Sequence, residues 1–141
     1  MIKQVSVFLE NKVGRLENIL EVLYQYNINL RSISVAETTD YGIIRLILDK
    51  PDMAIEKLKE AGFMVRETRV LALEISDVTG SMLSVIKELS ANDISVEYTY
   101  SSLPLHGNNV IIIIRVDDNE KALDVLKESK NAKPLNIEEL A

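Results

Sequence analysis

The strongest constraint on this sequence is that it contains one pattern twice. The stretch from Asn11 to Leu16 (NKVGRL) returns 66 positions later as Asp77 to Met82 (DVTGSM), which aligns Gly14 with Gly80. An internal repeat of this kind decides the fold and is read before any single residue. The same offset aligns the apolar positions Val5, Val7, Leu9, Leu16, Ile19, Leu20 and Leu23 with Leu71, Leu73, Ile75, Met82, Val85, Ile86 and Leu89.

The repeat continues to the end of the chain at a slightly larger offset. Ala54, Ile55 and Leu58 align with Ala122, Leu123 and Leu126 at 68 positions, so the second copy holds two extra residues. The simplest place for them is the turn at His106-Gly107-Asn108. We therefore predict two modules, residues 1–68 and 69–141.

Each copy predicts the same order of elements. Residues 5–10 alternate between apolar and polar, apart from Phe8, as a half-buried strand does. Residues 15–26 carry apolar side chains at helical spacing. Strands over 30–37, 43–48 and 63–68 and a helix that starts at Pro51 complete the copy. The order βαββαβ predicts an α+β chain of two ferredoxin-like modules, each with an antiparallel sheet and two helices on one face.

Composition excludes several classes of function. The 141 residues carry a net charge of −6, whereas nucleic-acid binders need a basic surface. There is no cysteine, which removes disulfides, thiolate metal sites and cysteine nucleophiles. The longest aliphatic run, Val110 to Ile114, is far shorter than the roughly 20 residues that cross a bilayer. The first residues lack the apolar core of a signal peptide, so we expect a soluble, cytoplasmic protein without a membrane partner.

The loop before the first helix is the most informative candidate site. Gly14 permits a backbone angle closed to other residues, and the helix after it offers unpaired N–H groups that attract a carboxylate. The amides of Asn11 and Asn29 can accept hydrogen bonds from an ammonium group or donate to a carboxylate. Together these groups suit a zwitterion. The same asparagines and glycine also suit a purely local role, since they favour turns and helix ends.

Two βαββαβ copies, each with an [N/D]-x-x-G-x-[L/M] turn after the first strand, resemble tandem ACT domains. Asn11 to Leu16, followed by Tyr26 to Leu30 (YNINL), is the strongest match, with Val13 in place of the usual proline and Asn27 in place of the usual glycine. The resemblance covers nearly the whole chain. It implies a non-catalytic regulatory or sensory protein that binds an amino acid between paired modules, needs no cofactor and forms a homodimer.

Carried over by position, the resemblance assigns a set of ligand-binding residues in each copy. In the first copy they are Asn11, Val13, Gly14, Arg15, Leu16, Ile28 and Asn29. In the second they are Asp77, Thr79, Gly80, Ser81, Met82, Ile94 and Ser95. Asp77 would repel a carboxylate and Ser95 is shorter than Asn29, so we expect unequal sites and favour the first copy. The aliphatic surroundings suggest a branched-chain or other small amino acid.

The remaining polar residues offer no catalytic centre. His106 has no second histidine or cysteine nearby and reads as a solvated loop residue. Glu37, Asp40 and Asp49 fall at strand ends, where charge faces water. Tyr98 and Tyr100 share one face of a strand and suit packing or a ligand cleft. We expect neither an enzyme nor a metal site, since no nucleophile elbow, P-loop or HExxH motif is present.

An alternative function is a regulatory subunit of an amino-acid biosynthetic enzyme. The first strand and loop, together with the segment from Ile33 to Thr38 (ISVAET), resemble the small subunit of acetohydroxyacid synthase. That subunit continues into a different C-terminal domain instead of a second ACT copy. The two readings differ in whether a catalytic subunit accompanies the chain.

Overall fold

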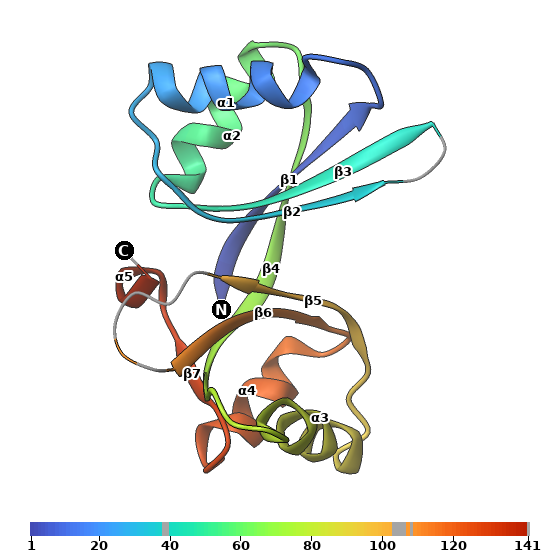
Figure 1. The fold of residues 1–141 in the computed structure, drawn as a ribbon, viewed down its shortest axis with the longest axis vertical. Helices are drawn as coiled ribbons and strands as arrows, with labels where there is room; N and C mark the ends of the chain where they lie inside the picture. The colour runs from blue at the N-terminus through green and yellow to red at the C-terminus, as the bar shows by residue number, and fades with distance from the viewer. Residues whose placement is uncertain (38–39, 103–106, 108, 141) are drawn as a thin grey trace. The chain divides into compact units, whose positions relative to one another are not determined.

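The chain folds into two compact units, seen in a computed structural model that describes residues 1–37, 40–102, 107 and 109–140. The first unit is Lys3–Thr68. The second unit runs from Arg69 onward and includes Met1–Ile2. Each unit contains a sheet with two long helices on one face (Figure 1).

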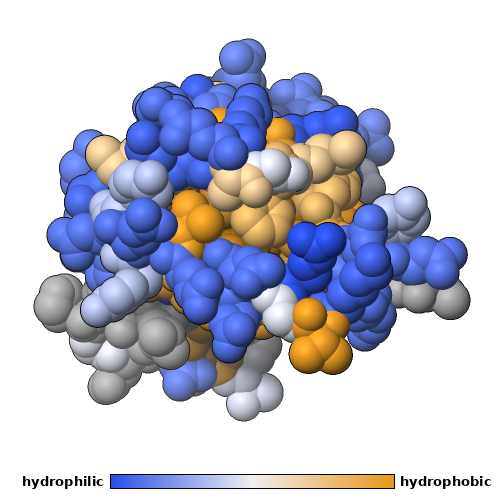
Figure 2. All heavy atoms as spheres, turned by 90° about the horizontal axis from the view of Figure 1, so that it is seen from above, coloured by the Kyte–Doolittle hydropathy of each residue, from blue (hydrophilic) through white to orange (hydrophobic). Residues whose placement is uncertain are grey.

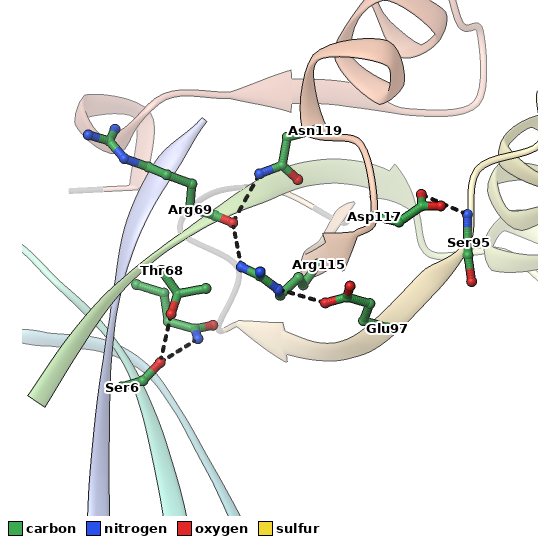
Figure 3. Close-up of polar contacts among 9 residues, drawn as sticks. Ser6, Thr68, Arg69, Ser95, Glu97, Arg115, Asp117 and Asn119 are labelled. Carbon is green, nitrogen blue, oxygen red and sulfur yellow. Dashed lines mark hydrogen bonds and ion pairs between the residues drawn. The ribbon is translucent and has the colours of Figure 1, made fainter.

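The first unit has the predicted βαββαβ order. Its elements are β1 (Ile2–Glu10), α1 (Arg15–Gln25), β2 (Leu30–Glu37), β3 (Tyr41–Leu48), α2 (Pro51–Glu60) and the first part of β4 (Met64–Ser76). The strands lie in the order β2-β3-β1-β4, and β3 pairs antiparallel with both β1 and β2. The hydroxyl oxygens of Ser6 in β1 and Thr68 in β4 lie 3.2 Å apart (Figure 3). This is the strand order of the ferredoxin-like fold.

The core of this unit lies between the sheet and its two helices. Alternation along β1 turns Val5, Val7 and Leu9 toward the core, as the sequence predicts. The helices contribute the buried side chains of Ile19, Leu23, Ala54 and Leu58. Phe63 and Val65, at the start of β4, pack against the same cluster.

The second unit repeats the first. Its elements are the second part of β4, α3 (Ser81–Ala91), β5 (Val96–Ser102), β6 (Asn109–Val116), α4 (Asn119–Lys127), β7 (Lys133–Leu135) and the short α5 (Ile137–Leu140). The strands lie in the order β5-β6-β4-β7, all antiparallel neighbours. Leu71, Leu73 and Ile75 enter the core with Val85 and Leu89, at the positions that the repeat predicts. The fold class is confirmed.

The structure differs from the sequence prediction at the junction of the copies. The predicted strand over 63–68 does not end there, because β4 is one strand of 13 residues that serves both units. Residues 64–76 (MVRETRVLALEIS) contain no glycine, proline or asparagine that would turn the chain. In the second unit, the carbonyl oxygen of Arg69 accepts hydrogen bonds from Arg115 at 3.4 Å and Asn119 at 3.1 Å, which tie β4 to β6 and α4 (Figure 3).

The ends of the first helix in each unit have the same backbone geometry. Gly14 and Gly80 precede α1 and α3 with φ of 87° and 88°. Asn27 and Asp93 follow the helices with φ of 54° and 59°. Asparagine and aspartate tolerate this left-handed conformation better than other non-glycine residues, which explains why Asn27 can stand where a glycine is usual.

No helix among the described residues has the length and apolarity required to cross a membrane.

Candidate functional site

The loop between β1 and α1 ends in a helix start without a side-chain cap. Gly14 is the N-cap residue and has no side chain to cap the first turn of α1, whose first N–H, that of Arg15, donates to the Lys12 carbonyl at 3.4 Å. The first N–H groups of a helix have no partner within the helix, so these donors and the positive end of the helix dipole point into the loop. Val13 beside Gly14 is fully exposed. The loop can therefore accept a carboxylate on backbone N–H groups.

Asn11 is held at the other end of the loop. Its side-chain nitrogen donates to the carboxylate of Glu37 at the end of β2, and its backbone N–H donates to the carbonyl of Asp40 at 3.5 Å. The amide nitrogen is therefore already engaged. The amide oxygen of Asn11, which can accept from an ammonium group, has no partner among the described residues.

Three charged side chains surround the start of the loop. Glu10 at the end of β1 forms an ion pair with Lys12 at 2.7 Å, and the Arg15 guanidinium lies 4.0 Å from the same carboxylate oxygen. The hydrogen bond from Lys12, its positive charge and the charge of Arg15 hold the pKa of Glu10 below its ordinary value. Glu10 is therefore ionised at neutral pH, and the cluster carries one net positive charge.

The far edge of the predicted site follows α1. Ile28 is buried in the first core, and Asn29 is exposed. The Asn29 N–H donates to the Asp49 carboxylate at 2.8 Å, and the Asp49 N–H donates back to the Asn29 carbonyl at 3.1 Å. This pair of hydrogen bonds fixes the turn into β2. The asparagine side chain itself stays at the surface.

The second unit repeats this turn. The Ser95 N–H donates to the Asp117 carboxylate at 3.0 Å (Figure 3), and the Asp117 N–H donates to the Ser95 carbonyl at 3.1 Å. Ile94, like Ile28, is buried in its core. The sequence signal for these contacts is an aspartate directly after the third strand of each copy, which our sequence analysis did not use for Asp117.

The second strand–helix loop opens onto a cavity of about 320 Å³. Asp77, Ser81 and Met82 of the predicted set line it, whereas Ser95 does not. Gly80 caps α3 without a side-chain hydrogen bond, as Gly14 caps α1. Tyr100 also lines the cavity, and its ring stacks on Tyr98 at a centroid distance of 6.5 Å. The remaining lining residues come from β4, β5, β6 and the loop after β4: Ile75, Ser76, Val78, Thr99, Ser101, Val110 and Ile112.

A larger pocket of about 460 Å³ lies in the first unit, behind the loop. Arg15 is the one residue of the predicted set that lines it. The other lining residues come from β1, β3, the turn between α2 and β4, and the first residue of β4: Phe8, Leu9, Glu10, Tyr41, Gly62, Phe63 and Met64. Sequence analysis missed this pocket. The available signal was Phe8, which breaks the polar alternation of its strand.

The other candidates have simple placements. The Glu37 carboxylate accepts a hydrogen bond from the Asn11 side chain, and the Asp49 carboxylate accepts one from the Asn29 N–H. His106 lies outside the described residues. Within the described part of the chain, no group of three or more histidine, aspartate or glutamate side chains is arranged to hold a metal ion.

Solved structures show the same fold. The crystal structure of protein BT0572 from Bacteroides thetaiotaomicron is 40% identical, with a TM-score of 0.91, over 99% of this chain and 94% of that chain. The ligand-free regulatory subunit of aspartate kinase from Thermus thermophilus has a TM-score of 0.62 at 14% identity, over 89% and 91% of the two chains. The corresponding subunit from Thermus flavus has a TM-score of 0.60 at 14% identity, over 89% and 90%.

The identity to the Thermus proteins is low, so they show a shared fold and nothing finer. Among curated protein sequences, none matches the chain. The ACT domain pair family matches residues 1–139, which confirms the resemblance drawn from the two loops. The chain belongs to the ACT domain pair family.

Proposed function

We propose that the chain is a regulatory protein that binds an amino acid at the strand–helix loops of its ACT domains and catalyses no reaction itself. Membership of a regulatory, amino-acid-binding family supports the class of function. The geometry that supports the site is the helix start without a side-chain cap, which appears at Gly14 and again at Gly80. A carboxylate would bind the N–H groups of the first turn that follow Arg15 and Ser81, whose own N–H groups donate to the carbonyls of Lys12 and Val78.

The ammonium group of the same ligand needs an acceptor within reach of the loop. In the first unit the amide oxygen of Asn11 and the carboxylate of Glu10 have this chemistry. In the second unit Asp77 has it. The proposal leaves Ile28 and Ile94 as packing residues, since both side chains are buried in the cores.

Regulation requires that the ligand bind one state of the protein more tightly than another. We propose that this state is an assembly, either a homodimer or a complex with an enzyme subunit. The concentration of the amino acid would then determine the fraction of the chain that is assembled. No step of this output requires a cofactor.

The test is thermal unfolding of the full chain with each of the twenty amino acids at millimolar concentration. A ligand at 100 times its dissociation constant adds about 2.7 kcal/mol, which raises the Tm by about 5 to 10 °C for a chain of this size. We expect one chemical group of amino acids to give this shift and Asn11→Ala to reduce it. Asn92→Ala, which removes an exposed asparagine at the end of α3, is the matched control. A flat panel with well-folded protein contradicts the proposal.

A further inference from the structure

The pocket of the first unit is formed by four segments that meet at one end of the sheet. Phe8, Leu9 and Glu10 come from the end of β1, Arg15 from the first residue of α1, and Tyr41 from the first residue of β3. Gly62 to Met64 close it from the turn between α2 and β4. Its volume of about 460 Å³ lies in the range of pockets that hold small molecules.

The lining is apolar and aromatic on one side. The chain has only two phenylalanines, and both of them, Phe8 and Phe63, line this pocket. Tyr41 and Met64 lie beside them with 61% and 71% of their surfaces exposed. Large apolar side chains that remain open to water are typical of a binding surface. The helix side of the first unit also exposes apolar side chains, such as Leu16 and Leu20 of α1, and Figure 2, which views that side, shows apolar residues at the surface with hydrophilic ones around them.

Two side chains of opposite charge, Arg15 and Glu10, are among the described residues that line the pocket. Lys12 pairs with Glu10 from outside the lining, and the Arg66 guanidinium lies 5.7 Å from the centre of the Phe8 ring. A ligand that carries both a carboxylate and an ammonium group matches the pair in the lining. Arg15 has the fork of donors that binds a carboxylate in two places.

Glu10 supplies the complementary acceptor. Its carboxylate lines the pocket and is ionised, and its partner Lys12 is an exposed side chain. Surface ion pairs contribute little free energy, so an ammonium group can replace Lys12 at small cost. A carboxylate on Arg15, an ammonium on Glu10 and an apolar side chain against the phenylalanines describe one class of molecule.

The cavity of the second unit lacks this combination. The positions that match Glu10 and Arg15 are Ser76 and Ser81, and the position that matches Phe8 is Glu74. Among the described residues that line it, Asp77 is the only charged one. The two cavities are therefore suited to different ligands.

We propose that the first-unit pocket is the amino-acid site of this protein and that it selects α-amino acids with a bulky apolar side chain. The inference rests on the proposed function and makes it more specific. It keeps leucine, one of the branched-chain amino acids that the sequence suggested, excludes the smaller amino acids and adds phenylalanine. It also assigns carboxylate binding to Arg15 and ammonium binding to Glu10.

The four methionines of the chain provide a direct test by ¹³C-methyl NMR of the full protein. Met64 lines the first-unit pocket and Met82 lines the second-unit cavity. Met64→Leu and Met82→Leu assign the two signals. We expect L-leucine and L-phenylalanine to shift the Met64 signal and to bind at least about tenfold more tightly than glycine, since each buried CH₂ contributes about 0.8 kcal/mol.

Two variants test the roles of the charges. Arg15→Gln should weaken L-phenylalanine about tenfold or more, as the loss of a charged hydrogen bond does. Glu10→Gln should weaken L-phenylalanine but leave phenylpyruvate, which has no ammonium group, unchanged. Lys87→Gln removes one positive charge from the exposed surface of α3 and should change neither affinity.

The outcomes separate this inference from the function on which it rests. If amino acids raise the Tm and shift Met82 while Met64 stays unmoved, the pocket assignment is wrong and amino-acid binding stands. Equal affinity for glycine and L-phenylalanine overturns the selectivity. If phenylpyruvate loses as much affinity as L-phenylalanine in Glu10→Gln, the ammonium contact is wrong. If no amino acid shifts either signal or the Tm, the proposed function itself fails.

Discussion

The left-handed glycine before α1 allows a sharp test of the backbone argument. Gly14 has a φ of 87°, and a Cβ atom built on it would meet no heavy atom within 4 Å. Gly14→Ala therefore adds no clash and isolates the cost of a left-handed L-residue, about 1–2 kcal/mol. Alanine also lowers the conformational entropy of the unfolded chain, which stabilises the folded protein by about 0.4–1 kcal/mol and offsets part of this cost. We expect a net loss of roughly 1 kcal/mol in the free energy of unfolding.

Gly42 in the same unit is the matched control. Its φ is not positive, and its Cβ would lie 3.7 Å from the Ala36 carbonyl oxygen, an ordinary contact. Gly42→Ala should therefore stabilise the protein, because alanine lowers the conformational entropy of the unfolded chain and is not strained in the folded one. The difference between the two variants in urea unfolding, followed by circular dichroism, should be about 1–2 kcal/mol.

A third variant tests the conformation itself. Gly14→Asn should be more stable than Gly14→Ala, because asparagine tolerates the left-handed region, as Asn27 does in this structure. If Gly14→Ala is as stable as Gly42→Ala, or if asparagine offers no advantage over alanine, the strain argument is refuted.

Two further predictions concern side chains. Asp118 caps α4 by accepting a hydrogen bond from the Lys121 N–H at 3.1 Å, so Asp118→Ala should lower the free energy of unfolding by about 1 kcal/mol. Asp124 lies inside the same helix and does not cap it, so an equal loss in Asp124→Ala would contradict the capping role. The pKa of Glu10 is lower in the folded protein than in the unfolded chain, so the ion pair with Lys12 stabilises the fold above the ordinary carboxyl pKa, and this stabilisation is lost as the pH falls through the pKa of the folded protein. In an NMR titration, Lys12→Gln should raise the pKa of Glu10. An unchanged pKa would exclude Lys12 as the cause.

Much of the fold was predictable because the sequence contains the same pattern of apolar and turn residues twice. The pattern within each copy predicted the βαββαβ order, and Gly14 and Gly80 marked the two loops, where the φ angles of these glycines agree within one degree. The predicted strand over 30–37 has the bounds of β2, and the helix predicted from Arg15 ends one residue earlier than expected. These are local signals of spacing and turn chemistry, which a sequence carries directly.

The pocket of the first unit was not predictable in this way. Phe8, Tyr41 and Phe63 are far apart in the sequence and meet only when β1, β3 and the α2–β4 turn assemble. The spacing of residues within one segment does not predict a cavity that four segments form together. The same limit explains the missed contact between Asn11 and Glu37, which joins the two ends of different elements.

The shared strand β4 has a practical consequence for anyone who wishes to study one half of this protein alone. A fragment that stops at Thr68 would cut β4 within its 13 residues, and a fragment that begins at Arg69 would lack Met1 and Ile2, which belong to the second unit. The buried side chain of Ile2 would then be separated from the second unit in the first fragment and absent from the other. Single-domain expression of this chain therefore calls for fragments that overlap across β4, and a circularly permuted gene that places Met1 and Ile2 beside the second copy would be the better starting point.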